Sequence, residues 1–76
     1  MKCIYDVRYE VQWYSAEPTH WERHSVKVCS GPDALEAVEV ARKAALGQHR
    51  LDDNGRDEHC TGFRLREVVL VAEAEL

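Results

Sequence analysis

The sequence holds four histidines and three cysteines, the side chains from which a metal site or a thiol nucleophile would be built. A zinc site needs three or four such ligands converging at about 2.0–2.3 Å. His20 and His24 are four residues apart, which in a strand separates them by about 13 Å. His59 and Cys60 are adjacent, so on a strand they point to opposite faces and form no nucleophile–base pair. We therefore expect no metal, no cofactor and no enzymatic activity.

An acidic run over residues 52–58, Asp-Asp-Asn-Gly-Arg-Asp-Glu, has the composition of a calcium loop. When Gly55 is aligned with the glycine that such loops require, Arg50 takes the first ligand position and Thr61 the last. Neither can act as the required ligand. We interpret the run as a tight turn at Asn54-Gly55 within a polar loop over residues 48–60.

Large aromatic residues flank a break in the sequence pattern at residues 15–20. Exposed Trp and Tyr side chains bury much area on binding with few rotors to freeze. The sequence predicts a partner-binding site made of Trp13, Tyr14, His20 and Trp21. The alternative, which stays open, is that Trp13 caps the core while Tyr14 and Trp21 form a cross-strand pair that stabilises a hairpin.

Strict alternation over residues 3–14 predicts a strand that is half buried. Its polar face carries Asp6, Arg8, Glu10 and Gln12, and its apolar face carries Cys3, Tyr5, Val7, Tyr9, Val11 and Trp13. A second strand over about residues 21–29 follows. A hairpin that pairs Tyr14 with Trp21 sets Val7 opposite Val28, so that the apolar faces coincide.

A helix begins after Gly31-Pro32, with Asp33 as its N-cap and Glu36 at capping-box spacing. Gly47 is a natural stop. Five small residues (Ala34, Ala37, Ala41, Ala44 and Ala45) would let the helix lie close to a sheet, and its apolar positions at helical spacing are Leu35, Val38, Ala41, Ala45 and Leu46.

The last strand runs from about residue 62 or 63 to Ala72, and its alternation changes phase at Arg66–Glu67, which predicts a bulge. The fold class is α+β: a β-β-α-β domain over residues 1–76, with a three-stranded sheet in the order 2-1-3 and one helix on one face. At an edge, Val68–Ala72 would offer an unpaired apolar backbone. A homodimer through this strand is therefore one prediction, and coverage by the loop 48–60 or by the C-terminal tail is the alternative.

The chain has 76 residues, a mass of 8.7 kDa and a net charge of -4, which leaves room for one small domain and argues against a general nucleic-acid binder. The longest apolar run, Val68–Ala72, is far too short to cross a membrane. The start of the chain has no apolar stretch of signal-peptide length, and three cysteines make a poor disulfide framework. We expect a cytoplasmic protein with reduced thiols.

The layout is similar to small β-β-α-β accessory proteins of phages and prophages, a mostly uncharacterised group that includes anti-CRISPR inhibitors. The features that carry the resemblance are the Tyr-x-Val-x-Tyr-x-Val strand from Tyr5 to Val11, the Trp21-Glu22 start of the second strand, Asp33 with Glu36-Ala37, and Thr61-Gly62-Phe63-Arg64. The resemblance implies a protein that binds and blocks a host protein, and it transfers no functional residue.

The sequence thus predicts a non-enzymatic protein-binding module, which the resemblance suggests is an inhibitor of a host defence complex. The competing hypothesis is a nucleic-acid-binding module that uses Arg8, Arg23 and Lys27 on the open sheet face, with Tyr14 and Trp21 as stacking platforms. The net negative charge, and Asp6 and Glu10 on the same face, count against nucleic acid.

Overall fold

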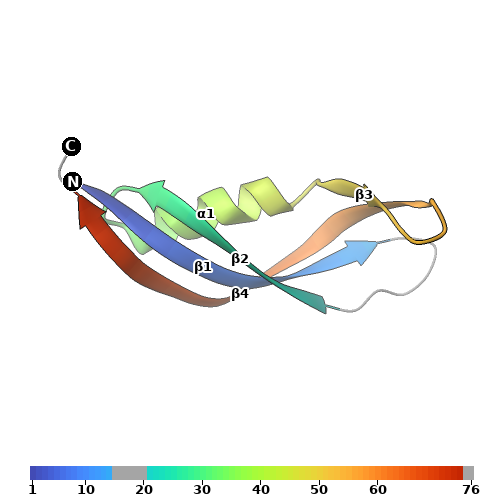
Figure 1. The fold of residues 1–76 in the computed structure, drawn as a ribbon, viewed down its shortest axis with the longest axis horizontal. Helices are drawn as coiled ribbons and strands as arrows, with labels where there is room; N and C mark the ends of the chain where they lie inside the picture. Colours follow the sequence, from blue (N-terminus) through green and yellow to red (C-terminus); the bar gives the residue numbers. More distant parts are fainter. Residues whose placement is uncertain (15–20, 75–76) are drawn as a thin grey trace.

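The structure, a computed structural model, describes residues 1–14 and 21–74, so the predicted site residue His20 lies outside the described residues. Four strands and one helix follow the order β1 (Lys2–Tyr14), β2 (Trp21–Ser30), α1 (Ala34–Ala45), β3 (His49–Leu51) and β4 (Asp57–Ala74). They form one sheet in the order β2-β1-β4-β3, in which neighbouring strands are antiparallel, with α1 on one face (Figure 1). The predicted α+β class is confirmed.

The prediction of three strands was wrong because part of the expected loop over residues 48–60 forms a hairpin. β3 pairs with the start of β4, His49 opposite His59 and Leu51 opposite Asp57. Asp52 closes the turn, since its Oδ1 accepts from the backbone N–H groups of Asn54 and Arg56 at 2.8 Å each. All three β3 residues are exposed, so no hydrophobic alternation marks the strand. The order 2-1-3 is right for the three long strands and becomes β2-β1-β4-β3.

The β1–β2 pairing differs from the predicted register by two residues. Val7 lies opposite Val26 rather than Val28, and Trp21 lies opposite Gln12 rather than Tyr14. A shift of two residues keeps each side chain on its face, whereas a shift of one would reverse all of them. The predicted apolar face of β1 therefore holds, although the predicted Tyr14–Trp21 pair does not form.

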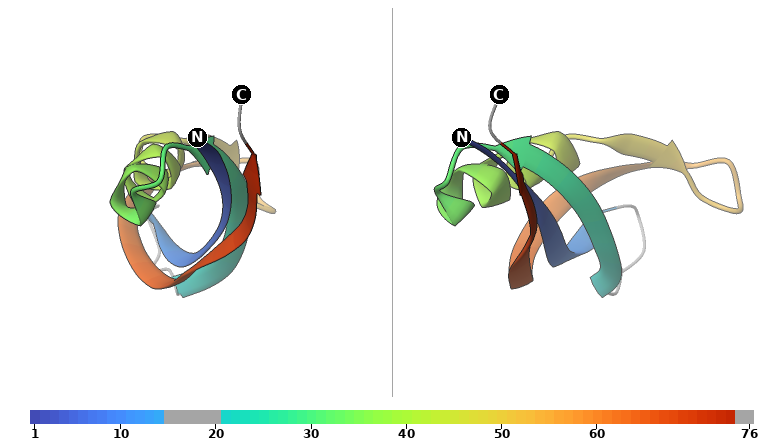
Figure 2. Two further views of the ribbon diagram at one scale, coloured as in Figure 1. Left: turned by 90° about the vertical axis from the view of Figure 1, so that its left-hand side faces the viewer. Right: turned by 60° about the vertical axis from the view of Figure 1, so that its left-hand side comes forward.

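β4 is longer than predicted and carries three extra residues relative to β1. The pairing shifts by one residue between Ile4 and Tyr5, between Arg8 and Tyr9, and between Gln12 and Trp13, which leaves Val71, Arg66 and Thr61 without a partner on β1. The bulge predicted at Arg66–Glu67 is confirmed. Bulges bend a strand and increase its twist. The sheet accordingly curls around the helix, as the end-on view in Figure 2 shows.

The core lies between α1 and the face of the sheet that we call the inner face. Cys3, Tyr5, Val7 and Val28 pack there against Ala37 and Ala41, and a second cluster joins Val11, Trp13 and Cys60 to Ala45. Alanines thus bring the helix close to the sheet, as predicted. The prediction for Leu35 was wrong: its side chain is 70% exposed, because the buried stripe is Ala37–Ala41–Ala45.

Both predicted helix ends are confirmed. Asp33 is the N-cap, and its Oδ1 accepts from the Leu35 backbone N–H at 3.0 Å. Gly47 follows the C-cap Leu46 with φ of 86°, a left-handed conformation that glycine adopts without strain.

In the described part of the chain no helix has the length and apolar character needed to span a membrane.

Candidate binding face of the sheet

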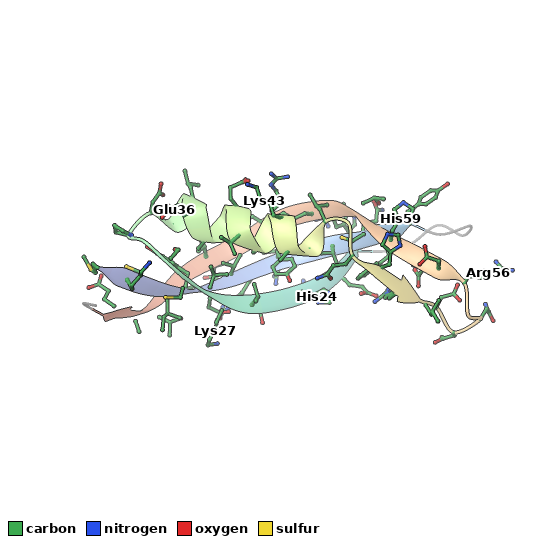
Figure 3. The ribbon with its side chains drawn as sticks, turned by 90° about the horizontal axis from the view of Figure 1, so that it is seen from above. His24, Lys27, Glu36, Lys43, Arg56 and His59 are labelled. Atoms are coloured by element: carbon green, nitrogen blue, oxygen red, sulfur yellow. The ribbon has the colours of Figure 1, made fainter. Side chains whose placement is uncertain are left out.

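The face of the sheet opposite α1, which we call the outer face, concentrates positive charge. Along β1 from Lys2 to Gln12 the register turns toward it six of the chain's ten basic side chains, namely Lys2, Arg8, Arg23, Lys27, Arg64 and Arg66. The described carboxylates on this stretch are three: Asp6, Glu10 and Glu67. Figure 3 shows Lys27 projecting from β2 away from α1. Because the chain as a whole carries a charge of -4, the remainder of the molecule is strongly acidic.

A hollow of about 260 Å³ lies within this face. It is lined by Arg8 from β1, by Arg66 from β4, and by Arg23, His24 and Ser25 from β2. The bulge in β4 explains the third arginine, because it inserts Arg66 between Leu65 and Glu67, the partners of Tyr9 and Arg8. Three arginines from three neighbouring strands therefore border one depression.

Ion pairs fix some of these arginines and leave others unpaired. Arg8 donates to Asp6 at 3.2 Å and to Glu67 at 2.9 Å, and Arg64 donates to Glu10 at 2.9 Å. The bond from Arg64 lowers the pKa of Glu10, with a further contribution from the nearby charges of Arg66 and Arg23. Within the described residues, Arg23 and Arg66 themselves make no hydrogen bond or ion pair.

Trp21 continues the outer face beyond the arginines. The guanidinium carbon of Arg64 lies 4.2 Å from the centre of a Trp21 ring, a cation–π contact. Gly62 lets the indole approach, since a Cβ there would lie 2.9 Å from Cη2 of Trp21. The predicted site residue Trp21 is thus half-buried and held against its neighbours on β4.

Tyr14 lies on the outer face at the end of β1. Its ring is 61% exposed and contacts His59 with 5.4 Å between ring centres, and His59 in turn lies 5.7 Å from His49. His49 makes a 3.0 Å contact through Nδ1 to Asp57. Figure 3 shows His59 in β4, close to the end of the molecule that carries the β3–β4 hairpin. Tyr14 is the most accessible of the predicted aromatic residues.

Trp13 belongs to the inner face and is separated from the other predicted site residues. It is 6% exposed, and its Nε1 donates to Glu22 at 3.0 Å. Arg50 forms two bonds to the same carboxylate, at 3.0 and 2.8 Å, while its guanidinium carbon lies 4.1 Å from the Trp13 ring centre. These bonds lower the pKa of Glu22 to about 2, the bond from Arg50 being the largest cause. Trp13 therefore supports the fold and offers little surface to a partner.

The described residues hold no group of three His, Cys, Asp or Glu side chains that could hold a metal ion. Cys3, Cys29 and Cys60 are free thiols, of which only Cys29 is exposed. Burial raises the pKa of Cys60, the opposite of what activates a thiol nucleophile.

Sequence reasoning identified Arg8, Arg23 and Lys27 as neighbours on the open face, and the structure places all three there. It missed Arg64 and Arg66, which lie on β4. The phase change at Arg66–Glu67 was the available signal, because a bulge puts an extra side chain next to the strand. Arg50 was missed because it lies in β3, a strand without hydrophobic alternation.

Comparison of the chain with protein families, with curated proteins and with solved structures gives no match.

Proposed function

We propose that this protein is a non-enzymatic binding module that holds an acidic partner protein on the outer face of its sheet. The observation that carries the proposal is the separation of charge: six basic side chains against three carboxylates gather on one face of a chain whose net charge is -4. Such a field steers an oppositely charged partner to one surface and repels it from the rest.

The composition of the face favours a protein over nucleic acid. Arginine, tryptophan and tyrosine are the residues enriched at protein interfaces, and Trp21 and Tyr14 continue the arginine-rich surface. The carboxylates of Asp6, Glu10 and Glu67 pair with Arg8 and Arg64, so the face lacks the continuous run of unpaired cations that a long phosphate backbone needs. A partner protein with basic groups among its acidic ones can complement this alternation.

The resemblance of the chain to small phage accessory proteins suggests which partners to test first. Proteins of that kind bind and block host proteins, so we propose a component of a host defence complex as the partner. The resemblance does not say which residues would make the contact. The charge and the exposure of the outer face supply that choice.

Charge reversal on the outer face tests the proposal. Immobilised wild-type chain and an Arg23→Glu variant would be compared for partner capture from host lysate, followed by calorimetry with the purified partner. We expect binding to weaken by at least about tenfold, since loss of a charge pair at an interface costs several kcal/mol. Arg56→Glu is the matched control, because Arg56 lies at the tip of the β3–β4 hairpin (Figure 3) and should capture as the wild type does.

Equal capture by wild type and Arg23→Glu would remove the outer face as the site. A gel-shift with mixed single-stranded oligonucleotides at low salt separates the competing class of partner. If the wild type shifts the oligonucleotides and Arg23→Glu does not, the result would instead support the nucleic-acid-binding hypothesis.

A homodimer joined through β4 is a second candidate, and it can coexist with partner binding. On the side of β4 that faces away from β1, no described strand pairs with the stretch from Thr61 to Ala74. Val68–Ala72 therefore lies at an open edge of the sheet. Leu65, Leu70 and Val71 on this strand are between 44% and 52% exposed. An open edge with apolar side chains is a template for a second strand.

A further inference from the structure

The hollow on the outer face is bordered by arginines with hydrogen-bond donors that the described part of the fold leaves unused. A guanidinium group has five N–H donors. Arg8 uses two of its nitrogens on Asp6 and Glu67, and within the described residues Arg23 and Arg66 use none. Ser25, whose side chain carries a hydroxyl, also belongs to the lining, and no Asp or Glu is among the lining residues.

The backbone holds these groups in place. Arg8 and Ser25 face each other in the β1–β2 ladder, and Arg23 is two residues from Ser25 on the same face. On the other side, the bulge places Arg66 next to Glu67, which anchors Arg8 at 2.9 Å. The three arginines are therefore carried by three paired strands rather than by loops.

The neighbouring carboxylates are already engaged. Glu10 accepts from Arg64, and Asp6 and Glu67 accept from Arg8. Counting these seven side chains together, four guanidinium groups stand against three carboxylates, which leaves a surplus of positive charge before any ligand binds. Planar guanidinium forks match the geometry of a tetrahedral oxyanion, and bonds between charged groups are the strong ones.

We propose that this hollow, the oxyanion site, binds a phosphate-type oxyanion through Arg8, Arg23, Arg66 and Ser25. The ligand is inorganic phosphate or a phosphoryl group carried by a partner. Binding of free phosphate at the hollow does not depend on the proposed function. The inference rests on that function only where a partner protein carries the phosphoryl group. The oxyanion site would thus specify which chemical group of the partner is recognised.

The test is a titration followed by nuclear magnetic resonance of the arginine Nε–H groups and backbone amides. Inorganic phosphate, phosphoserine and serine are added separately at an ionic strength held constant with sodium chloride. We expect saturable shifts at Arg23, Ser25 and Arg66 with phosphate and phosphoserine, and none with serine. Tighter binding of phosphoserine than of free phosphate would indicate a phosphoryl group on a protein, and the reverse order would indicate the free ion.

Arg66→Gln should weaken phosphate binding about tenfold, the effect of losing one charge-assisted hydrogen bond. Arg56→Gln, at the distant hairpin tip, should bind as the wild type does. Arg23→Gln provides a second variant if Arg66→Gln alters the bulge, and an unchanged amide spectrum elsewhere shows that each variant is folded. Linear shifts that do not saturate, or equal binding by Arg66→Gln, Arg23→Gln and Arg56→Gln, would overturn the inference.

The two proposals fail separately. If the wild type shows no saturable response to phosphate while Arg23→Glu loses partner capture, the oxyanion site is wrong and the proposed function stands. If phosphate binds at the hollow while Arg23→Glu still captures the partner, the proposed function is wrong and the oxyanion site stands.

Discussion

Glu22 organises the end of the inner face that α1 does not cover. Its carboxylate accepts from Trp13 and twice from Arg50, and a weaker 3.4 Å contact joins it to His24. Arg50 also lies 3.6 Å from Glu58, which is 8% exposed. A partly buried charge must be matched in this way, because an unpaired one would cost several kcal/mol. The group thus links β2 to the β3–β4 hairpin through side chains.

Glu22 should make the stability of the protein depend on pH. Its pKa of about 2 in the folded state lies below the ordinary value of 4.5, so the folded state gains stability above pH 4.5 and loses it as the pH falls toward 2. The gain is at most about 3 kcal/mol, since each pKa unit corresponds to about 1.4 kcal/mol. Urea unfolding of wild type and Glu22→Gln at pH 7 and pH 2.5 would measure it.

The expected result is a large difference in unfolding free energy between the two proteins at pH 7 that shrinks at pH 2.5. Asp53→Asn is the control, because Asp53 is exposed in the β3–β4 turn and should leave the pH dependence unchanged. A difference between wild type and Glu22→Gln that stays constant with pH would show that the carboxylate charge is not what stabilises the cluster.

Gly62 should be sensitive to the smallest enlargement. An added Cβ would lie 2.9 Å from Cη2 of Trp21 and 3.0 Å from Cβ of Gln12, and the latter cannot swing away. We expect Gly62→Ala to cost about 1–3 kcal/mol in unfolding free energy and to move Trp21 away from Arg64. Tryptophan fluorescence during urea unfolding would report both effects, and an unchanged spectrum and midpoint would contradict the expectation.

The helix shows at the scale of an element how small residues set a distance. Ala37, Ala41 and Ala45 are at most 4% exposed and lie against the curled sheet, so a longer side chain has no space to enter. We expect Ala41→Leu to lower the free energy of unfolding by about 1–3 kcal/mol through overpacking. Ala44→Leu on the same helix is the control, since Ala44 is exposed and the change there should be within about 0.5 kcal/mol. Thermal unfolding followed by circular dichroism would compare them.

The elements show where the sequence pattern is sufficient and where it fails. Alternation from Cys3 to Trp13 specifies which face of β1 is buried, and Asp33 and Gly47 specify the helix ends. A hydrophobic pattern cannot distinguish registers that differ by two residues, which is why the β1–β2 pairing was displaced. The bulge at Val71 lies in a run where either phase is apolar, and the one at Thr61 lies where no alternation exists, so neither could be predicted.

The candidate site was predictable only in part for a related reason. Tyr14, Arg8 and Arg23 could be placed on the open face because β1 alternates clearly and β2 is paired with it so that their apolar residues share a face. Arg66 reaches that face through a bulge, which simple alternation does not describe. Trp13 is buried as the alternation of β1 indicates, so its assignment to the binding site overrode the pattern. The total charge could not reveal the basic face, because the fourteen acidic residues of the chain outnumber its ten basic residues.

The state of association belongs to the whole molecule. The free side of β4 favours a homodimer, and we expect its loss when Leu70 is replaced by Lys, because a charge on an edge strand opposes pairing with a second strand. Light scattering over a range of concentrations would show an apparent mass approaching twice 8.7 kDa for wild type and 8.7 kDa for Leu70→Lys. A wild type that stays monomeric at the highest concentration would exclude the homodimer.

The central position of β1 also has a consequence for how the chain folds. β1 pairs on one side with β2, which follows it after a short connection. On its other side it pairs with β4, which comes much later in the sequence: Tyr14 lies opposite His59 and Lys2 lies opposite Ala74. Closing so long a loop is costly before the contacts form, and proteins dominated by distant pairings fold in about milliseconds to seconds. Until then, a hairpin of β1 and β2 exposes the backbone of β1 along its whole length. The risk of aggregation is therefore greatest during synthesis and refolding, before β4 has paired with β1.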